Sequence, residues 1–115
     1  MIEKSTVDRT LEFREARDWK QFHNPKNLAE SVVIESSELL EVFQWIDSSS
    51  SEEYAIENRD KIADEVADIL IYLIYLCDDL GIDLDEVIAK KLQKNEERYP
   101  QEKSKGNSKK YNELE

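Results

Sequence analysis

The spacing of apolar and polar positions predicts four helices along this chain. The first helix is predicted from residue 6 to about residue 22, where side chains recur at helical intervals, namely Val7, Thr10, Leu11, Arg14 and Asp18. Pro25 ends that pattern, because a proline disfavours helical geometry in the residue before it, here Asn24. Asn27 is a residue type that caps helices, so the second helix is predicted over residues 28–46.

A serine-rich connection at residues 47–53 separates the second helix from the third. The third helix is predicted to begin at Tyr54 or Asn58. It is expected to end at Leu80, because Gly81 is the residue type that most often follows a helix C-terminus.

A fourth helix follows, capped by Asp83 or Asp85 and ending at about Glu97. After it the chain becomes polar and basic. We therefore predict a helical domain over residues 1–100 and a basic polar C-terminal tail over residues 101–115. The lysines of this tail are Lys103, Lys105, Lys109 and Lys110.

The third helix is apolar nearly all round between Val66 and Leu76. A helix of this kind is buried on more than one side. Four helices of a short chain cannot surround it fully, so we expect a second copy to cover part of it, in a homodimer or homotetramer. The alternative is a closed monomeric bundle.

Composition supports an all-α fold and narrows the possible partners. The 115 residues suit one domain, and only two glycines and two prolines interrupt it. The formal net charge is −11, so binding of nucleic acid through a basic patch is not expected. A polyphosphate would also be repelled unless metal ions bridge it to the carboxylates.

The expected location is the cytoplasm. Cys77 is the single cysteine and cannot form an intrachain disulfide, which suits a reducing compartment. The first residues are polar rather than typical of a signal peptide. The longest apolar run, residues 69–77, is too short to cross a membrane.

Two acidic pairs at helical spacing carry the candidate chemistry. Glu35 and Glu38 lie three residues apart in one apolar stretch, and Glu65 and Asp68 do so in another. Residues three apart share a helix face. Carboxylates grouped beside apolar faces repel one another unless a cation lies between them, and oxygen ligands suit Mg²⁺ or Mn²⁺. Ordinary solvated helix faces remain the alternative.

Several other side chains have two open interpretations. Trp19 and Trp45 flank the acidic second helix and would stack on a nucleobase or anchor a core. His23 is the only histidine, which excludes a di-iron site built from two Glu-x-x-His motifs. The polar face of the fourth helix would hold phosphate or sugar, or be simply solvated; it comprises Lys90, Lys91, Asn95 and Arg98.

Longer segments resemble the MazG-like nucleotide pyrophosphohydrolases, and most closely their dCTP pyrophosphatase branch. The resemblance covers nearly the whole chain outside the serine-rich connection. It is carried by residues 17–28 (RDWKQFHNPKNL), 35–45 (ESSELLEVFQW), 64–72 (DEVADILIY), 91–100 (KLQKNEERYP) and 108–111 (SKKY).

The resemblance implies a four-helix MazG-like bundle completed by oligomerisation, with active sites between subunits. It implies Mg²⁺-dependent hydrolysis of a nucleoside triphosphate, such as dCTP or a modified dNTP, to the monophosphate and pyrophosphate. Such an enzyme would remove altered nucleotides or control a nucleotide pool. A nucleotide-binding or sensing module with little turnover, and a structural interaction protein, are the alternatives.

Roles follow by position from this resemblance. Glu35, Glu38, Glu65 and Asp68 would be the metal ligands, and Glu41 would orient a metal-bound water, so Glu38 and Glu41 are the expected catalytic pair. The expected substrate-binding residues are Trp19, Trp45, Tyr72, Lys91, Asn95, Arg98, Lys110 and Tyr111. Thr10 stands where some dCTP-specific members carry a histidine, so looser base discrimination is expected.

Overall fold

The computed structural model describes residues 2–114 and is helical, with no strand in that range. The predicted all-α class is therefore confirmed. The described chain forms two compact units, of which the first ends at Gly81 and the second begins at Ile82. The predicted division at residues 100 and 101 stays a prediction, and its end residues Met1 and Glu115 lie outside the described range. No helix within residues 2–114 has the length and hydropathy to cross a membrane.

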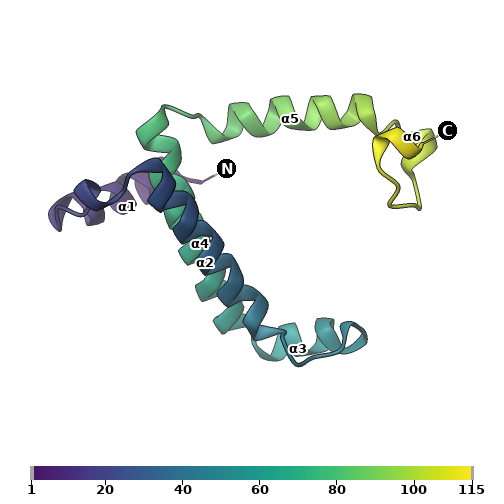
Figure 1. The fold of residues 1–115 in the computed structure, drawn as a ribbon, viewed down its shortest axis with the longest axis horizontal. Helices are drawn as coiled ribbons and strands as arrows, with labels where there is room; N and C mark the ends of the chain where they lie inside the picture. Colours follow the sequence, from purple (N-terminus) through teal and green to yellow (C-terminus); the bar gives the residue numbers. More distant parts are fainter. Residues whose placement is uncertain (1, 115) are drawn as a thin grey trace. The chain divides into compact units, whose positions relative to one another are not determined.

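An antiparallel helix pair forms the centre of the first unit. Figure 1 shows α2 and α4 side by side along much of their length, and α1 also contacts α4. The elements of this unit are α1 (Lys4–Ala16), η1 (Lys20–Phe22), α2 (Pro25–Val42), η2 (Ser48–Ser50), α3 (Ser51–Glu57) and α4 (Arg59–Leu80).

The first helix is shorter than predicted, because α1 ends at Ala16. Asp18 then adopts a left-handed conformation with φ of 52°. The Asp18 N–H donates to Glu15 O over 3.0 Å, and the Trp19 N–H donates to Arg14 O over 3.1 Å. These are the two hydrogen bonds of a Schellman motif, which ends a helix by satisfying its last carbonyls.

The cap of α2 lies earlier than predicted. The Asn24 side chain accepts a hydrogen bond from the Asn27 N–H over 2.8 Å, and Pro25 occupies the first turn. The prediction that Asn27 is the cap was wrong, because proline fits the first helical position, where its missing N–H needs no partner.

The predicted third helix divides at Asn58 into α3 and α4, and α3 already begins at Ser51. The prediction that the serine-rich connection extends to residue 53 was therefore wrong, since its last three residues are helical. The predicted start at Asn58 lies next to the start of α4 at Arg59, whereas Tyr54 lies inside α3. Gly81 follows α4 with φ of 65°, which confirms its predicted role.

The second unit contains α5 (Leu84–Arg98), α6 (Gln101–Ser104) and η3 (Tyr111–Glu113). The Asp83 side chain caps α5 by accepting from the Glu86 N–H over 3.1 Å, as one of the two predictions had it. Near the C-terminal end the Tyr111 ring packs edge-on against Tyr99, with 6.2 Å between centroids.

The hydrophobic core of the first unit is small. Its buried apolar residues are Leu28, Val42, Ile74 and Tyr75, of which Leu28 is fully buried. Large apolar side chains stay exposed on the paired helices and beyond them, namely Val33, Ile34, Leu40, Trp45, Ile56, Val66 and Leu70. So much exposed apolar surface is typical of a protein that binds a partner.

Candidate metal centre

Four carboxylates from the two central helices converge on one point. Helix α2 supplies Glu35 and Glu38, and α4 supplies Glu65 and Asp68. One ligand oxygen of each lies within 4.8 Å of all the others. The helical spacing puts each pair on one face, and the pairing of α2 with α4 brings the two faces together.

Two buried oxygens of this cluster have no hydrogen-bond partner. The Oε2 atoms of Glu35 and Glu65 are both buried and accept no hydrogen bond. A buried polar atom without a partner costs free energy, so such atoms call for an explanation. Oxygens held for a cation would supply one.

Electrostatics in the cluster favour protonation when no cation is present. Burial, and then the nearby Glu38 carboxyl, raise the pKa of Glu35 to about 7. Burial and Glu38 also raise the pKa of Glu65. Both shifts have the direction expected for carboxylates that lose hydration and repel one another. A divalent cation bound among these oxygens would lower both pKa values, because it stabilises the charged carboxylates.

The donor set fits a hard divalent cation. Mg²⁺ binds oxygen ligands at about 2.0–2.1 Å, so ligands on opposite sides of it lie about 4.2 Å apart. The observed limit of 4.8 Å is close to that separation. The residues present could therefore hold a metal ion, although their role as ligands stays a prediction.

The other predicted residues of the first unit lie at different distances from the core. Glu41 is exposed on α2, one turn beyond Glu38. Tyr72 is half-buried on α4, one turn beyond Asp68. Trp45 is 87% exposed, so it is not part of the core of the first unit as described over residues 2–81.

The remaining predicted residues belong to the second unit. Lys91 is exposed on α5, and Asn95 is half-buried on the same helix. The Arg98 guanidinium lies over the Tyr111 ring, 4.7 Å from its centroid. Lys110 directly precedes Tyr111 and is exposed. Their predicted contacts with substrate stay untested predictions.

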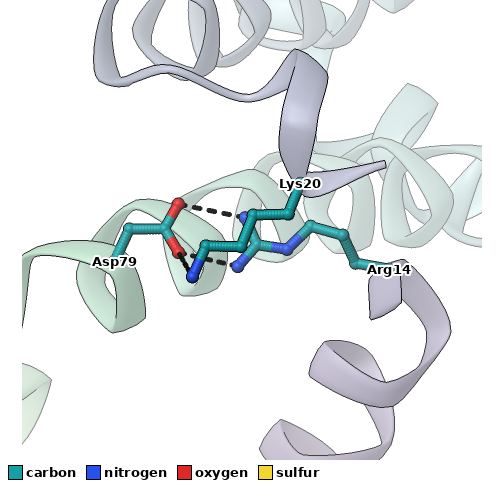
Figure 2. Close-up of polar contacts among 3 residues, drawn as sticks. All are labelled: Arg14, Lys20 and Asp79. Carbon is teal, nitrogen blue, oxygen red and sulfur yellow. Dashed lines mark hydrogen bonds and ion pairs between the residues drawn. The ribbon is translucent and has the colours of Figure 1, made fainter. Parts of the chain in front are cut away.

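Sequence reasoning missed an ion cluster at the end of α4. Arg14 is buried and donates two hydrogen bonds to Asp79, over 3.0 and 2.7 Å. The Lys20 ammonium lies 3.6 Å from the same carboxylate. Figure 2 shows the three side chains together. Hydrogen bonding from Arg14 lowers the pKa of Asp79. The position of Arg14, at helical intervals from Val7 and Leu11 on the buried side of α1, was the available signal.

Aromatic rings extend this cluster toward Tyr72. The Arg14 guanidinium lies 4.5 Å from the centroid of Tyr75, and His23 stacks on that ring at 5.5 Å and 26°. Tyr72 packs edge-on against both rings. Burial, together with the charge of Arg14, lowers the pKa of His23.

Comparison with known proteins places these features in a family context. The model of the MazG-like family matches residues 31–114. The chain is 38% identical over 105 residues to dCTP pyrophosphatase 1 of Homo sapiens and 40% identical over 105 residues to that of Bos taurus. Each match covers 90% of this chain, which spans only 62% of the length of those relatives.

A solved structure is also similar. A pyrophosphatase from Archaeoglobus fulgidus superposes with a TM-score of 0.81 at 45% sequence identity. The match covers 84% of this chain and 91% of that chain. At this identity and coverage the two proteins are similar in sequence as well as in fold.

Proposed function

Because the chain belongs to the MazG-like family, we propose that it is a metal-dependent nucleoside triphosphate pyrophosphohydrolase. It converts a deoxynucleoside triphosphate, dCTP or a modified dNTP, to the monophosphate and pyrophosphate. The relatives named dCTP pyrophosphatase and the neighbour named pyrophosphatase support this activity.

The observation that carries the proposal is the cluster of Glu35, Glu38, Glu65 and Asp68 with its two unpartnered buried oxygens. These residues would hold Mg²⁺, or Mn²⁺ in its place. Such an ion supplies charge neutralisation on the triphosphate and lowers the pKa of a water molecule.

The acidic face of α2 has a further role in the reaction. Water attacks the α-phosphorus, the bond from that phosphorus to the bridging oxygen breaks, and pyrophosphate leaves. Glu38 would help to hold the cation beside the reacting phosphate. Glu41, one turn along the same helix, would orient the attacking water and accept the proton that it loses.

Binding of the nucleotide is assigned to residues outside the acidic cluster. Trp19 and Trp45 would stack on the base, and Tyr72 would contact the sugar or phosphates. The cationic and polar groups of the second unit would contact the phosphates, namely Lys91, Asn95, Arg98, Lys110 and Tyr111.

Discrimination among bases is expected to be loose. The Thr10 hydroxyl donates its proton to Thr6 O over 2.8 Å, within helix α1. It can therefore accept a hydrogen bond from a base but cannot donate one at the same time. A site with fewer polar groups directed at the base rejects analogues less strongly.

The active protein is proposed to be a homodimer or homotetramer. The exposed apolar side chains on and beyond α2 and α4 give a second copy a surface to cover, and Trp45 is the most exposed of them. Light scattering on the purified protein measures the oligomeric state directly. The free thiol of Cys77 supports a reducing compartment, the cytoplasm.

Product analysis tests the proposed activity. The protein is incubated with Mg²⁺ and a panel of canonical and modified nucleoside triphosphates, and the products are separated. Monophosphate with pyrophosphate is the expected pair. Diphosphate with inorganic phosphate would contradict attack at the α-phosphorus, and nucleotide binding without products would support a sensing module instead.

A further inference from the structure

Trp19 lies between two cations that share one carboxylate. Arg14 precedes it and donates two hydrogen bonds to Asp79, while Lys20 follows it directly and lies 3.6 Å from an Asp79 oxygen. Figure 2 shows the two side chains reaching the carboxylate from different elements. The segment that carries Trp19 is therefore held to α4 on both sides.

A backbone hydrogen bond and a ring contact fix the position of Trp19 relative to Arg14. The Trp19 N–H donates to Arg14 O over 3.1 Å, through the left-handed turn at Asp18. The ring packs edge-on against Phe13, with centroids 5.6 Å apart, and the Arg17 guanidinium lies 3.7 Å from the Phe13 centroid. Trp19 thus keeps a fixed relation to Arg14.

Asp79 connects this segment to the helix that carries half of the acidic cluster. It lies on α4, eleven residues beyond Asp68, which is about 16 Å along the helix axis. Its side chain is 13% exposed and that of Arg14 is 4% exposed. Breaking a pair this well buried leaves an uncompensated charge, so the contact has one strongly preferred geometry.

We propose that Asp79 is a positioning residue for base binding, which sets where Trp19 stands relative to Glu65 and Asp68. The proposal rests on the proposed function, in which Trp19 stacks on the base. Asp79 itself touches no substrate. It acts through Arg14 and Lys20, so its loss weakens base binding and leaves the cation site intact.

The first test separates binding from chemistry. Asp79→Asn keeps the size of the side chain but removes its charge, and it is expected to raise KM for the preferred triphosphate about threefold to tenfold, part of the value of one stack. The kcat is expected to change less, about twofold at most, because stacking holds ground state and transition state alike. Asp60→Asn, on an exposed residue in the first turn of the same helix, is the matched control and is expected to leave KM unchanged.

A second variant, with a smaller expected effect on stability, keeps the test valid if Asp79→Asn does not fold. Lys20 has a side chain that is 66% exposed, so Lys20→Gln removes one contact to Asp79 at little cost in stability. It is expected to raise KM in the same direction as Asp79→Asn but by less. Asp79→Glu, which restores the charge, is expected to recover part of the wild-type KM.

A second readout does not depend on turnover. In a Trp45→Phe background Trp19 is the single tryptophan, and acrylamide quenching of its fluorescence reports how firmly it is held. Asp79→Asn is expected to increase quenching, and Asp60→Asn to leave it unchanged. If wild type hydrolyses no triphosphate, the proposed function fails while this readout still tests the position of Trp19. Unchanged KM and unchanged quenching in a folded Asp79→Asn protein would overturn the inference.

Discussion

The guanidinium of Arg14 and the carboxylate of Asp79 form a two-pronged ion pair, with N–O distances of 3.0 and 2.7 Å. The two residues are 65 positions apart in sequence and join α1 to the end of α4. Paired hydrogen bonds between these groups fix orientation as well as distance. The first helix is therefore held in a defined place on the central pair.

This ion pair predicts a loss of stability in acid. Arg14 lowers the folded-state pKa of Asp79 below its ordinary value of 3.8. A carboxyl with a lowered pKa contributes stability above its unfolded pKa and loses it as pH falls through the folded pKa. We expect the difference in unfolding free energy between wild type and Asp79→Asn to be constant above about pH 5 and to shrink below about pH 4.

Urea unfolding at a series of pH values, for both proteins, measures that difference. Asp60→Asn serves as the control, since Asp60 is exposed and lies in the first turn of α4, at the other end of the helix from Asp79. A difference that persists unchanged to pH 2 would show that the charge of Asp79 is not what stabilises the fold.

The acidic cluster predicts the opposite pH dependence for the metal-free protein. The pKa of Glu35 rises from 4.5 to about 7 on folding. The folded state then binds the proton more tightly, so this contribution is fully present below pH 4.5 and is lost as pH rises through about 7. In EDTA, the melting temperature of wild type should fall across that window relative to Glu35→Gln. Equal slopes for the two proteins would contradict the shift.

Truncation of the exposed Trp45 side chain is expected to weaken substrate binding. Trp45→Ala is expected to raise KM more than it lowers kcat, by about 1–3 kcal/mol in binding, the size of one base stack. Leu40→Ala, which removes another exposed apolar side chain of the first unit, is the matched control. Unchanged KM with dissociation of the oligomer would make Trp45 an interface anchor instead.

Removal of the C-terminal segment is expected to lower activity without unfolding the protein. The Tyr111 ring contacts both Tyr99 and Arg98, so it attaches the segment to the C-terminal end of α5. Truncation after Gln101 removes Tyr111 and Lys110 and is expected to lower kcat/KM while the melting temperature without ligand stays the same. Kinetics identical to the full chain would leave the segment without a role in the reaction.

The acidic pairs were predictable because the arrangement within each pair depends only on residues close together in the sequence. A spacing of three residues puts Glu35 beside Glu38 whatever the rest of the fold does. That the second pair meets the first depends on how α2 and α4 pack. The apolar stretches around both pairs already favoured one shared site between two helices, and the resemblance to known proteins strengthened that prediction.

The end of α1 and the ion pair at Asp79 were not predictable in the same way. Asp18 adopts the left-handed turn without a glycine to signal it. The partner of Arg14 lies on another helix, and no periodicity links positions 65 residues apart. Contacts of that kind arise from tertiary packing, which local patterns do not encode.

The most direct test of the account is pyrophosphate release by Glu38→Gln in the presence of Mg²⁺. The change removes one negative charge from the centre of the cluster, so turnover should be abolished while the helical circular dichroism signal stays. Because like charges repel in the metal-free cluster, the variant should melt at or above the temperature of metal-free wild type. Glu30→Gln, on the exposed side of the same helix, should keep wild-type activity. Near-normal Mg²⁺-dependent release of pyrophosphate by Glu38→Gln would contradict the assignment of the metal centre.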